Sequence, residues 1–178
     1  MSNVVARSGL GIFAILLGIA AVPSSRVEGQ GRLSARVFLV QAQIPGRLSE
    51  RAMLGFARGH QSSRLVETQE PDITQRAWIA QMVTSFNHSP NDLEFHVLFY
   101  DTEEGGRRFV DDMSTFVNDR AQRTFVQRLR LRRPQFRPNR RMELVVTVDR
   151  QEVGRLAFAV LGEEARRTGE VSFTDDER

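Results

Sequence analysis

The chain has 178 residues, of which 25 are basic and 22 acidic, giving a net charge of +3 at neutral pH, and it contains no cysteine. The missing cysteines exclude disulfide bonds, thiolate metal ligands and a lipid anchor on an N-terminal cysteine. The isoelectric point near 10.7 arises because every basic residue is arginine, and a charge this balanced does not predict nucleic acid as a partner.

The N-terminal segment has the layout of a secretory signal peptide. Arg7 precedes an apolar and small-residue run over 8–22, and further small residues follow it. As a helix, 10–22 would extend roughly 20 Å, which is short of the about 30 Å of bilayer hydrocarbon. We expect residues 1–29 to form the signal peptide and 30–35 a linker, with an uncleaved membrane anchor as the alternative. The expected location of the domain is therefore the periplasm or the cell exterior, with no transmembrane span after cleavage.

The next segments predict a strand, a short helix and a brief strand. Residues 36–44 alternate in a way that suits a first strand. Residues 48–58 carry apolar side chains at spacings of three and four, with Ser49 placed as the N-cap and Gly59 as the C-cap. A short strand is expected over 64–68.

From Gln75 onward the apolar residues recur with a period of two. Residues 78–86 and 93–100 both alternate, and the turn-rich segment 87–92 separates them, so we expect them to pair as antiparallel neighbours. Residues 109–117 fit a helical stripe as well as a strand. The β-branched and aromatic residues favour the strand.

Three more strands complete the predicted domain. They are expected over 123–131, 142–148 and 153–161, with the last two paired. Short strands at this spacing predict a mainly β protein, an antiparallel β-sandwich of immunoglobulin-like outline over 36–161, with one short helix near the N-terminus of the mature chain. Residues 162–178 are charged and poor in large apolar groups, so they are expected to form a mostly disordered tail.

The sharpest local feature is a concentration of arginine in the second half of the chain. Three arginines share one face of the strand 123–131 and its end, and four more follow, so the candidate site for an anion or a partner consists of Arg128, Arg130, Arg132, Arg133, Arg137, Arg140 and Arg141. Guanidinium groups bind phosphate or carboxylate in a bidentate manner. The competing interpretation is a solvated outer face, partly neutralised by Glu143 opposite Arg130 or Arg132 and by nearby Asp149.

Other functional patterns are weak or missing. The three histidines are isolated, and the acids around Asp101 to Asp112 match no calcium loop, so no metal and no cofactor is predicted. Trp78 and Tyr100 are expected to fill the core.

The sequence thus favours an exported, non-catalytic β-sandwich module of a bacterial cell envelope. Its expected partner is a protein or an anionic envelope component bound by the arginine-rich strand face. The alternative is a β-sandwich hydrolase or carbohydrate-active enzyme that uses the loop carboxylates between Asp101 and Asp112. This alternative predicts that those acids line one cleft and have raised pKa values.

Overall fold

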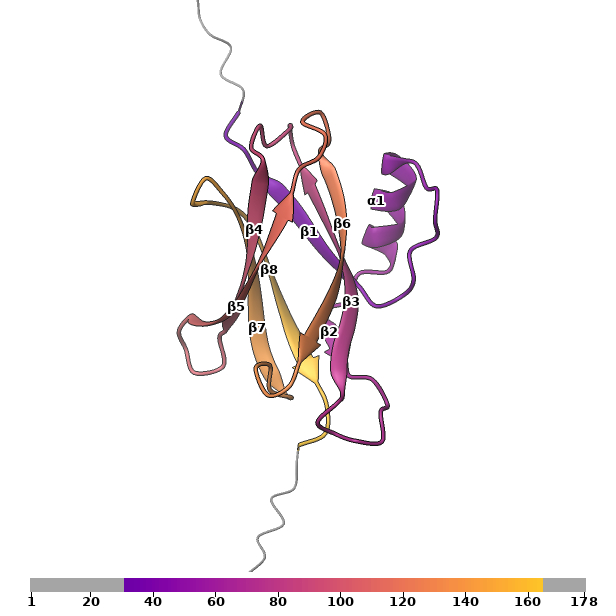
Figure 1. Cartoon of the computed structure of the whole chain (residues 1–178), viewed down its shortest axis with the longest axis vertical. Coiled ribbons are helices and arrows are strands. Elements are labelled where there is room, and N and C mark those ends of the chain that lie inside the picture. The colour runs from indigo at the N-terminus through magenta and orange to yellow at the C-terminus, as the bar shows by residue number, and fades with distance from the viewer. Residues whose placement is uncertain (1–30, 165–178) are drawn as a thin grey trace, which may run out of the picture. The chain divides into compact units, whose positions relative to one another are not determined.

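The computed structural model describes residues 31–164 (Figure 1). The predicted signal peptide and the predicted tail beyond residue 164 lie outside the described residues. Within them the elements are β1 (Ala35–Val40), α1 (Glu50–Gly59), β2 (Arg64–Val66), β3 (Ala77–Phe86), β4 (Glu94–Asp101), β5 (Arg108–Phe116), β6 (Thr124–Arg132), β7 (Arg140–Val148) and β8 (Gln151–Leu161).

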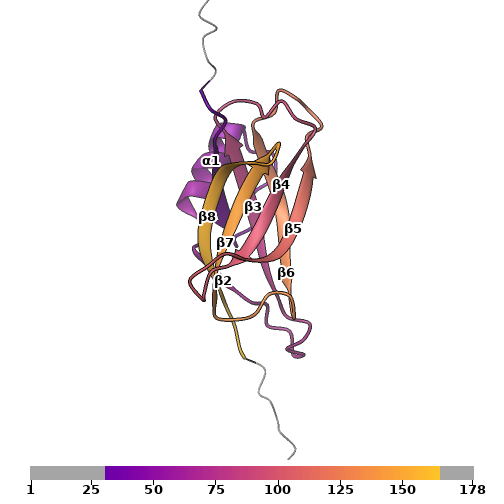
Figure 2. The same ribbon diagram turned by 90° about the vertical axis from the view of Figure 1, so that its left-hand side faces the viewer.

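The strands form two layers, as the sequence predicted. One sheet has the order β1-β3-β6 and the other β2-β8-β7-β4-β5, and all pairings are antiparallel except that of β2 with β8. This is the strand order of an immunoglobulin-like sandwich: β1, β3 and β6 take the places of strands A, B and E, while β8, β7 and β4 take those of G, F and C. Figure 2 shows the larger sheet from its outer side.

The core lies between the two sheets because alternate residues of each strand point inward. Strand β4 contributes Phe95, Val97 and Phe99, all buried, and β7 contributes its own alternating apolar set. Phe86, Phe95 and Phe125 form mutual edge-to-face contacts with ring centroids 5.1 to 5.8 Å apart. Such pairs add about 0.5–1.5 kcal/mol each beyond the burial of their area.

The predicted helix covers the outer face of the smaller sheet. Ser49 is its N-cap, as expected, and the Ser49 hydroxyl accepts a hydrogen bond from the Ala52 backbone N–H at 3.4 Å. The helix ends at Gly59 and the capping residue is His60, one position later than predicted. Ala57 packs against Val40 and Val83 in a second, smaller apolar cluster.

On one side of the sandwich, backbone pairing and close backbone contacts join the two sheets. The short strand β2 pairs with β8, and the next residue, Glu67, forms a bridge with Trp78 of β3, so this segment links the two sheets. Close by, a Cβ added to Gly154 of β8 would lie 2.6 Å from the backbone oxygen of Ala35. On this side, therefore, β1 and β8 approach within the distance that only glycine allows.

The predicted pairing of 78–86 with 93–100 is wrong. These segments are β3 and β4, and they lie in opposite sheets, because the chain over 87–93 crosses the sandwich instead of forming a hairpin. The predicted pairing of 142–148 with 153–161 is confirmed, and so is the preference for a strand over 109–117.

Candidate functional site

Three of the seven candidate arginines form an exposed row on β6. Arg128, Arg130 and Arg132 are solvent-exposed and lie on the outer face of the smaller sheet, opposite Gln81, Ile79 and Ala77 of β3. Residues two apart on a strand are about 7 Å apart. None of the three side chains forms an ion pair or a hydrogen bond with another described residue. We call Arg128, Arg130 and Arg132 the arginine row.

The sequence placed Glu143 opposite this row, and the structure contradicts it. Glu143 belongs to β7 in the other sheet, where its neighbours in register are Tyr100 and Ala157. The Glu143 carboxylate instead accepts a hydrogen bond from Arg107 Nε at 2.6 Å. The arginine row therefore lacks the neutralising acid that the competing interpretation required from Glu143.

Tyr100 was also wrongly expected in the core. It lies on the outer face of β4, half-buried, with the guanidinium of Arg107 5.6 Å from its ring centroid. Arg107 bonds Glu152 as well, at 3.2 Å, and its two carboxylate partners raise its pKa. Trp78, by contrast, is fully buried as expected, and Phe125, Phe136 and Phe158 are buried as well.

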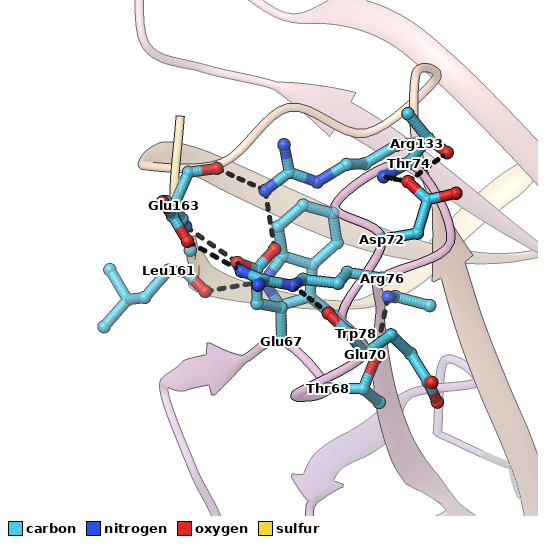
Figure 3. A network of polar contacts seen from close by, with 12 residues as sticks. Glu67, Thr68, Glu70, Asp72, Thr74, Arg76, Trp78, Arg133, Leu161 and Glu163 are labelled. Atoms are coloured by element: carbon cyan, nitrogen blue, oxygen red, sulfur yellow. Dashed lines mark hydrogen bonds and ion pairs between the residues drawn. The ribbon is translucent and has the colours of Figure 1, made fainter. Parts of the chain in front are cut away.

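Arg133 has a structural partner that the sequence did not reveal. Figure 3 shows Arg76 and Arg133 on either side of the buried Glu67 carboxylate. Arg133 Nη2 lies 2.6 Å from Glu67 Oε2, and Arg76 Nη1 lies 3.3 Å from Glu67 Oε1. The backbone N–H of Glu163 donates to Glu67 Oε1 at 2.7 Å. We call these four residues the Glu67 cluster.

The Glu67 cluster keeps its carboxylate ionised. Burial alone would raise the pKa of Glu67, but the hydrogen bond from the Glu163 backbone and the contacts with Arg133 and Arg76 outweigh it, so the pKa is lowered. The Arg133 guanidinium also lies over the ring of Trp78. The Arg133 side chain is only 10% exposed, and its charge is paired with Glu67 at the junction of β2, β3 and the β6–β7 loop.

Arg140 and Arg141 are also paired with acids of the β4–β5 region. Arg140 lies 3.9 Å from Asp101 and 3.6 Å from Glu104, and Arg141 Nε lies 3.3 Å from Glu103. Burial alone would raise the pKa of Asp101, but bonds from the Glu103 backbone and from Arg108 lower it overall. The pKa of Glu103 is lowered by bonds from the Arg141 backbone and side chain.

These lowered pKa values bear on the enzymatic alternative, which required raised ones. Asp101 points inward from β4 and is buried, whereas Asp112 lies on the exposed outer face of β5, 3.8 Å from His96. Asp101 and Glu104 line one small pocket together with Arg107 and Arg108, but Asp111 and Asp112 do not, so the acids between Asp101 and Asp112 do not line a single cleft. No group of three or more His, Asp or Glu side chains within residues 31–164 is placed to hold a metal ion.

A wide, open pocket lies at the end of the sandwich where the β6–β7 loop meets the loop 67–76. Its volume is about 1020 Å³. Three of the candidate arginines line it, together with apolar and acidic groups, among them Arg133, Pro134, Phe136, Arg137, Pro138 and Arg140. Arg137 is exposed there and has no ion pair with another described residue. The structure thus divides the seven arginines into the row on β6, the exposed Arg137, and three that are paired with acids.

Comparison with known proteins adds little to this description. No protein-family model and no curated protein matches the sequence. Among solved structures, the chain is similar to an immunoglobulin-like protein from Pseudomonas aeruginosa, with 10% sequence identity, coverage of 74% of this chain and 98% of the other, and a TM-score of 0.40. That TM-score is too low to carry a conclusion about function. Within residues 31–164, none of the helical structure has the length and hydropathy to cross a membrane.

Proposed function

We propose that this chain is an exported, non-catalytic β-sandwich module of a bacterial cell envelope that binds an anionic partner through Arg128, Arg130 and Arg132. The observation that carries the proposal is the contrast among the candidate arginines. Arg133, Arg140 and Arg141 are held by carboxylates of the same domain, whereas the arginine row is exposed and unpaired among the described residues.

The physical argument concerns like charges held close together. Three arginines at alternate positions, about 7 Å apart along the backbone of one strand, place like charges on the same face, where they repel one another, and none of them forms an ion pair with a carboxylate of the described residues. An anionic group bound across them would relieve the repulsion and form charge-assisted hydrogen bonds. Arg137, five residues beyond Arg132 in the adjoining loop, is a further exposed arginine that forms no ion pair with another described residue.

The proposal predicts that binding depends on these three positions and not on net charge alone. The test variant is Arg128→Gln/Arg130→Gln/Arg132→Gln, and the matched control is Arg58→Gln/Arg64→Gln/Arg120→Gln, which removes the same charge from exposed positions elsewhere. With immobilised poly-glutamate as the probe, the test variant should bind roughly 3- to 150-fold more weakly, because three surface ion pairs at about 0.2–1 kcal/mol each are lost.

Stability distinguishes a binding role from a structural one. The free energy of unfolding of the test variant should stay within about 0.5 kcal/mol of the parent, as for surface substitutions in general. Equal loss of binding in both variants would show that only overall charge matters. A marked loss of stability in the test variant would show that the arginine row is structural.

Export is the second part of the proposal and is supported by the signal-like N-terminus. Expression of the full chain in a bacterial host should yield a processed form, and mass spectrometry of its N-terminus should show cleavage near Ala20 or Gly29. Recovery of only the unprocessed chain from the membrane fraction would favour the anchored alternative.

A further inference from the structure

Strand β6 is an edge strand whose outer side is not paired. It forms a ladder with β3 along its whole length, from Thr124 to Arg132, and no other described strand pairs with it. Strand β5 lies on the same side of the sandwich (Figure 2), but the contacts between these regions are made by side chains. Gln127 donates to the Thr115 hydroxyl, and Gln135 donates to the Val110 carbonyl at 3.2 Å.

This side differs from the opposite one, where β2 and the close approach of β1 to β8 join the sheets. No described strand pairs with β6 on this side, so every second residue of β6 directs a backbone N–H and C=O away from the sheet without a partner strand. An edge of this kind is a template for another extended chain. The nine residues of β6 are enough for a full-length strand pairing.

The side chains of β6 restrict which chain can pair there. The outward row reads Val126, Arg128, Arg130 and Arg132 along the strand, and Val126 is 43% exposed. A second copy of β6 would set arginine against arginine, which disfavours self-pairing. A strand with carboxylates at alternate positions would set an acid opposite each arginine instead.

We propose that the free edge of β6 binds an extended acidic segment of a partner protein as an added antiparallel strand, with acids at three alternate positions facing Arg132, Arg130 and Arg128 and an apolar residue facing Val126. This inference rests on the proposed function and specifies its partner. The main chain of β6 supplies the pairing, and the arginine row supplies the selectivity and the register.

The test uses three synthetic peptides labelled for fluorescence anisotropy. The matched peptide reads Ser-Glu-Thr-Glu-Thr-Glu-Thr-Val-Ser. The second has the same composition with the three glutamates adjacent, and the third is the matched peptide with alternate backbone amides N-methylated on the side that would face β6. The matched peptide should bind at least tenfold more tightly than either of the others.

A charge swap tests the register. In the Arg130→Glu variant, affinity for the matched peptide should fall at least tenfold, and a peptide with arginine in place of the central glutamate should regain it. Arg58→Glu, on the exposed face of α1, is the control and should leave affinity for the matched peptide within twofold. Amide hydrogen exchange of the complex should slow within β6.

The outcomes separate this inference from the proposed function. If all three peptides bind alike, yet the triple glutamine variant weakens each, the arginine row binds anions without strand addition and this inference is overturned. If the triple variant has no effect on any peptide, both proposals are wrong. If a single-stranded RNA homopolymer binds through the row more tightly than the matched peptide, the partner is not a protein segment.

Discussion

Glu67 shows how one buried side chain determines the geometry of several segments. It follows β2, and its two carboxylate oxygens accept from Arg76, Arg133 and the Glu163 backbone. A Cβ added to Gly162 would lie 2.5 Å from the Glu67 carboxyl group, so glycine leaves the space that the carboxylate occupies. Removing one member of such a cluster leaves the buried charges of the others without a partner.

We predict that Glu67→Gln lowers the free energy of unfolding by about 3 kcal/mol at pH 7. The pKa of Glu67 is lower in the folded chain than in the unfolded one, so its contribution is complete above the ordinary glutamate pKa and is lost as the pH falls through the folded value. The difference between variant and parent should therefore shrink from pH 7 to pH 3. Urea unfolding followed by Trp78 fluorescence measures both.

The control for this prediction is Glu70→Gln, the same chemical change at an exposed side chain three residues away. It should alter the free energy of unfolding by less than about 0.5 kcal/mol at either pH. A difference between Glu67→Gln and the parent that is as large at pH 3 as at pH 7 would show that packing, not charge, makes Glu67 important.

At the scale of the elements, substitutions at two glycines can show how backbone conformation affects the free energy of unfolding when no side-chain contact changes. Gly55 lies in the exposed middle of α1, and Gly105 lies in the β4–β5 turn at φ +82°. A Cβ at either position would meet no other atom within 4 Å, so contacts cannot distinguish them. Only the second has a conformation that disfavours side chains.

We predict opposite effects for the same substitution. Gly55→Ala should raise the free energy of unfolding by about 0.5–1 kcal/mol, because alanine loses less conformational freedom in a helix. Gly105→Ala should lower it by about 1 kcal/mol, because alanine is strained at positive φ. Urea denaturation of both variants gives the two values. Stabilisation by both would mean that the turn relaxes, and no effect at Gly55 would mean that α1 unfolds before the sandwich.

The elements also show what the sequence could predict. Alternation and capping residues located the strands and the helix, because those signals are local. Pairing depends on the connections: the β7–β8 hairpin turns through Asp149 and Arg150, both at positive φ, which suits a tight two-residue turn. The segments 87–93 and 133–139 are longer and carry the chain to the other sheet. Turn-forming residues alone did not distinguish a hairpin from a loop that crosses between the sheets.

The candidate site was predictable to a similar degree. The spacing of Arg128, Arg130 and Arg132 was enough to predict that their side chains lie on one face of a strand, because the alternation of side chains along a strand is a local property. The partners of Arg133 and Arg141 are Glu67 and Glu103, which are remote in sequence and become neighbours only through the crossing loops. The sequence pattern assigned Glu143 to Arg130 or Arg132 because it placed their strands side by side, whereas β6 and β7 lie in different sheets.

At the scale of the whole domain, the inner faces of both sheets form one apolar cluster. It includes Trp78 of the smaller sheet and Leu144 of the larger one, both fully buried. The Trp78 indole N–H also donates to the Leu161 carbonyl of β8 at 2.8 Å, which couples the two layers. Among the described residues this cluster extends from Leu33 to Val160, so it draws on both sheets along nearly the whole described segment.

We therefore predict that a fragment of residues 31–164 folds alone and unfolds in a single transition. Trp78 fluorescence and far-ultraviolet circular dichroism should give the same urea midpoint. Leu144→Ala should lower the free energy of unfolding by about 2–5 kcal/mol and shift both signals together, although Trp78 lies in the opposite sheet. Because a shared core cannot lose one layer and keep the other, a Trp78 transition unmoved by Leu144→Ala would show that the two sheets unfold separately.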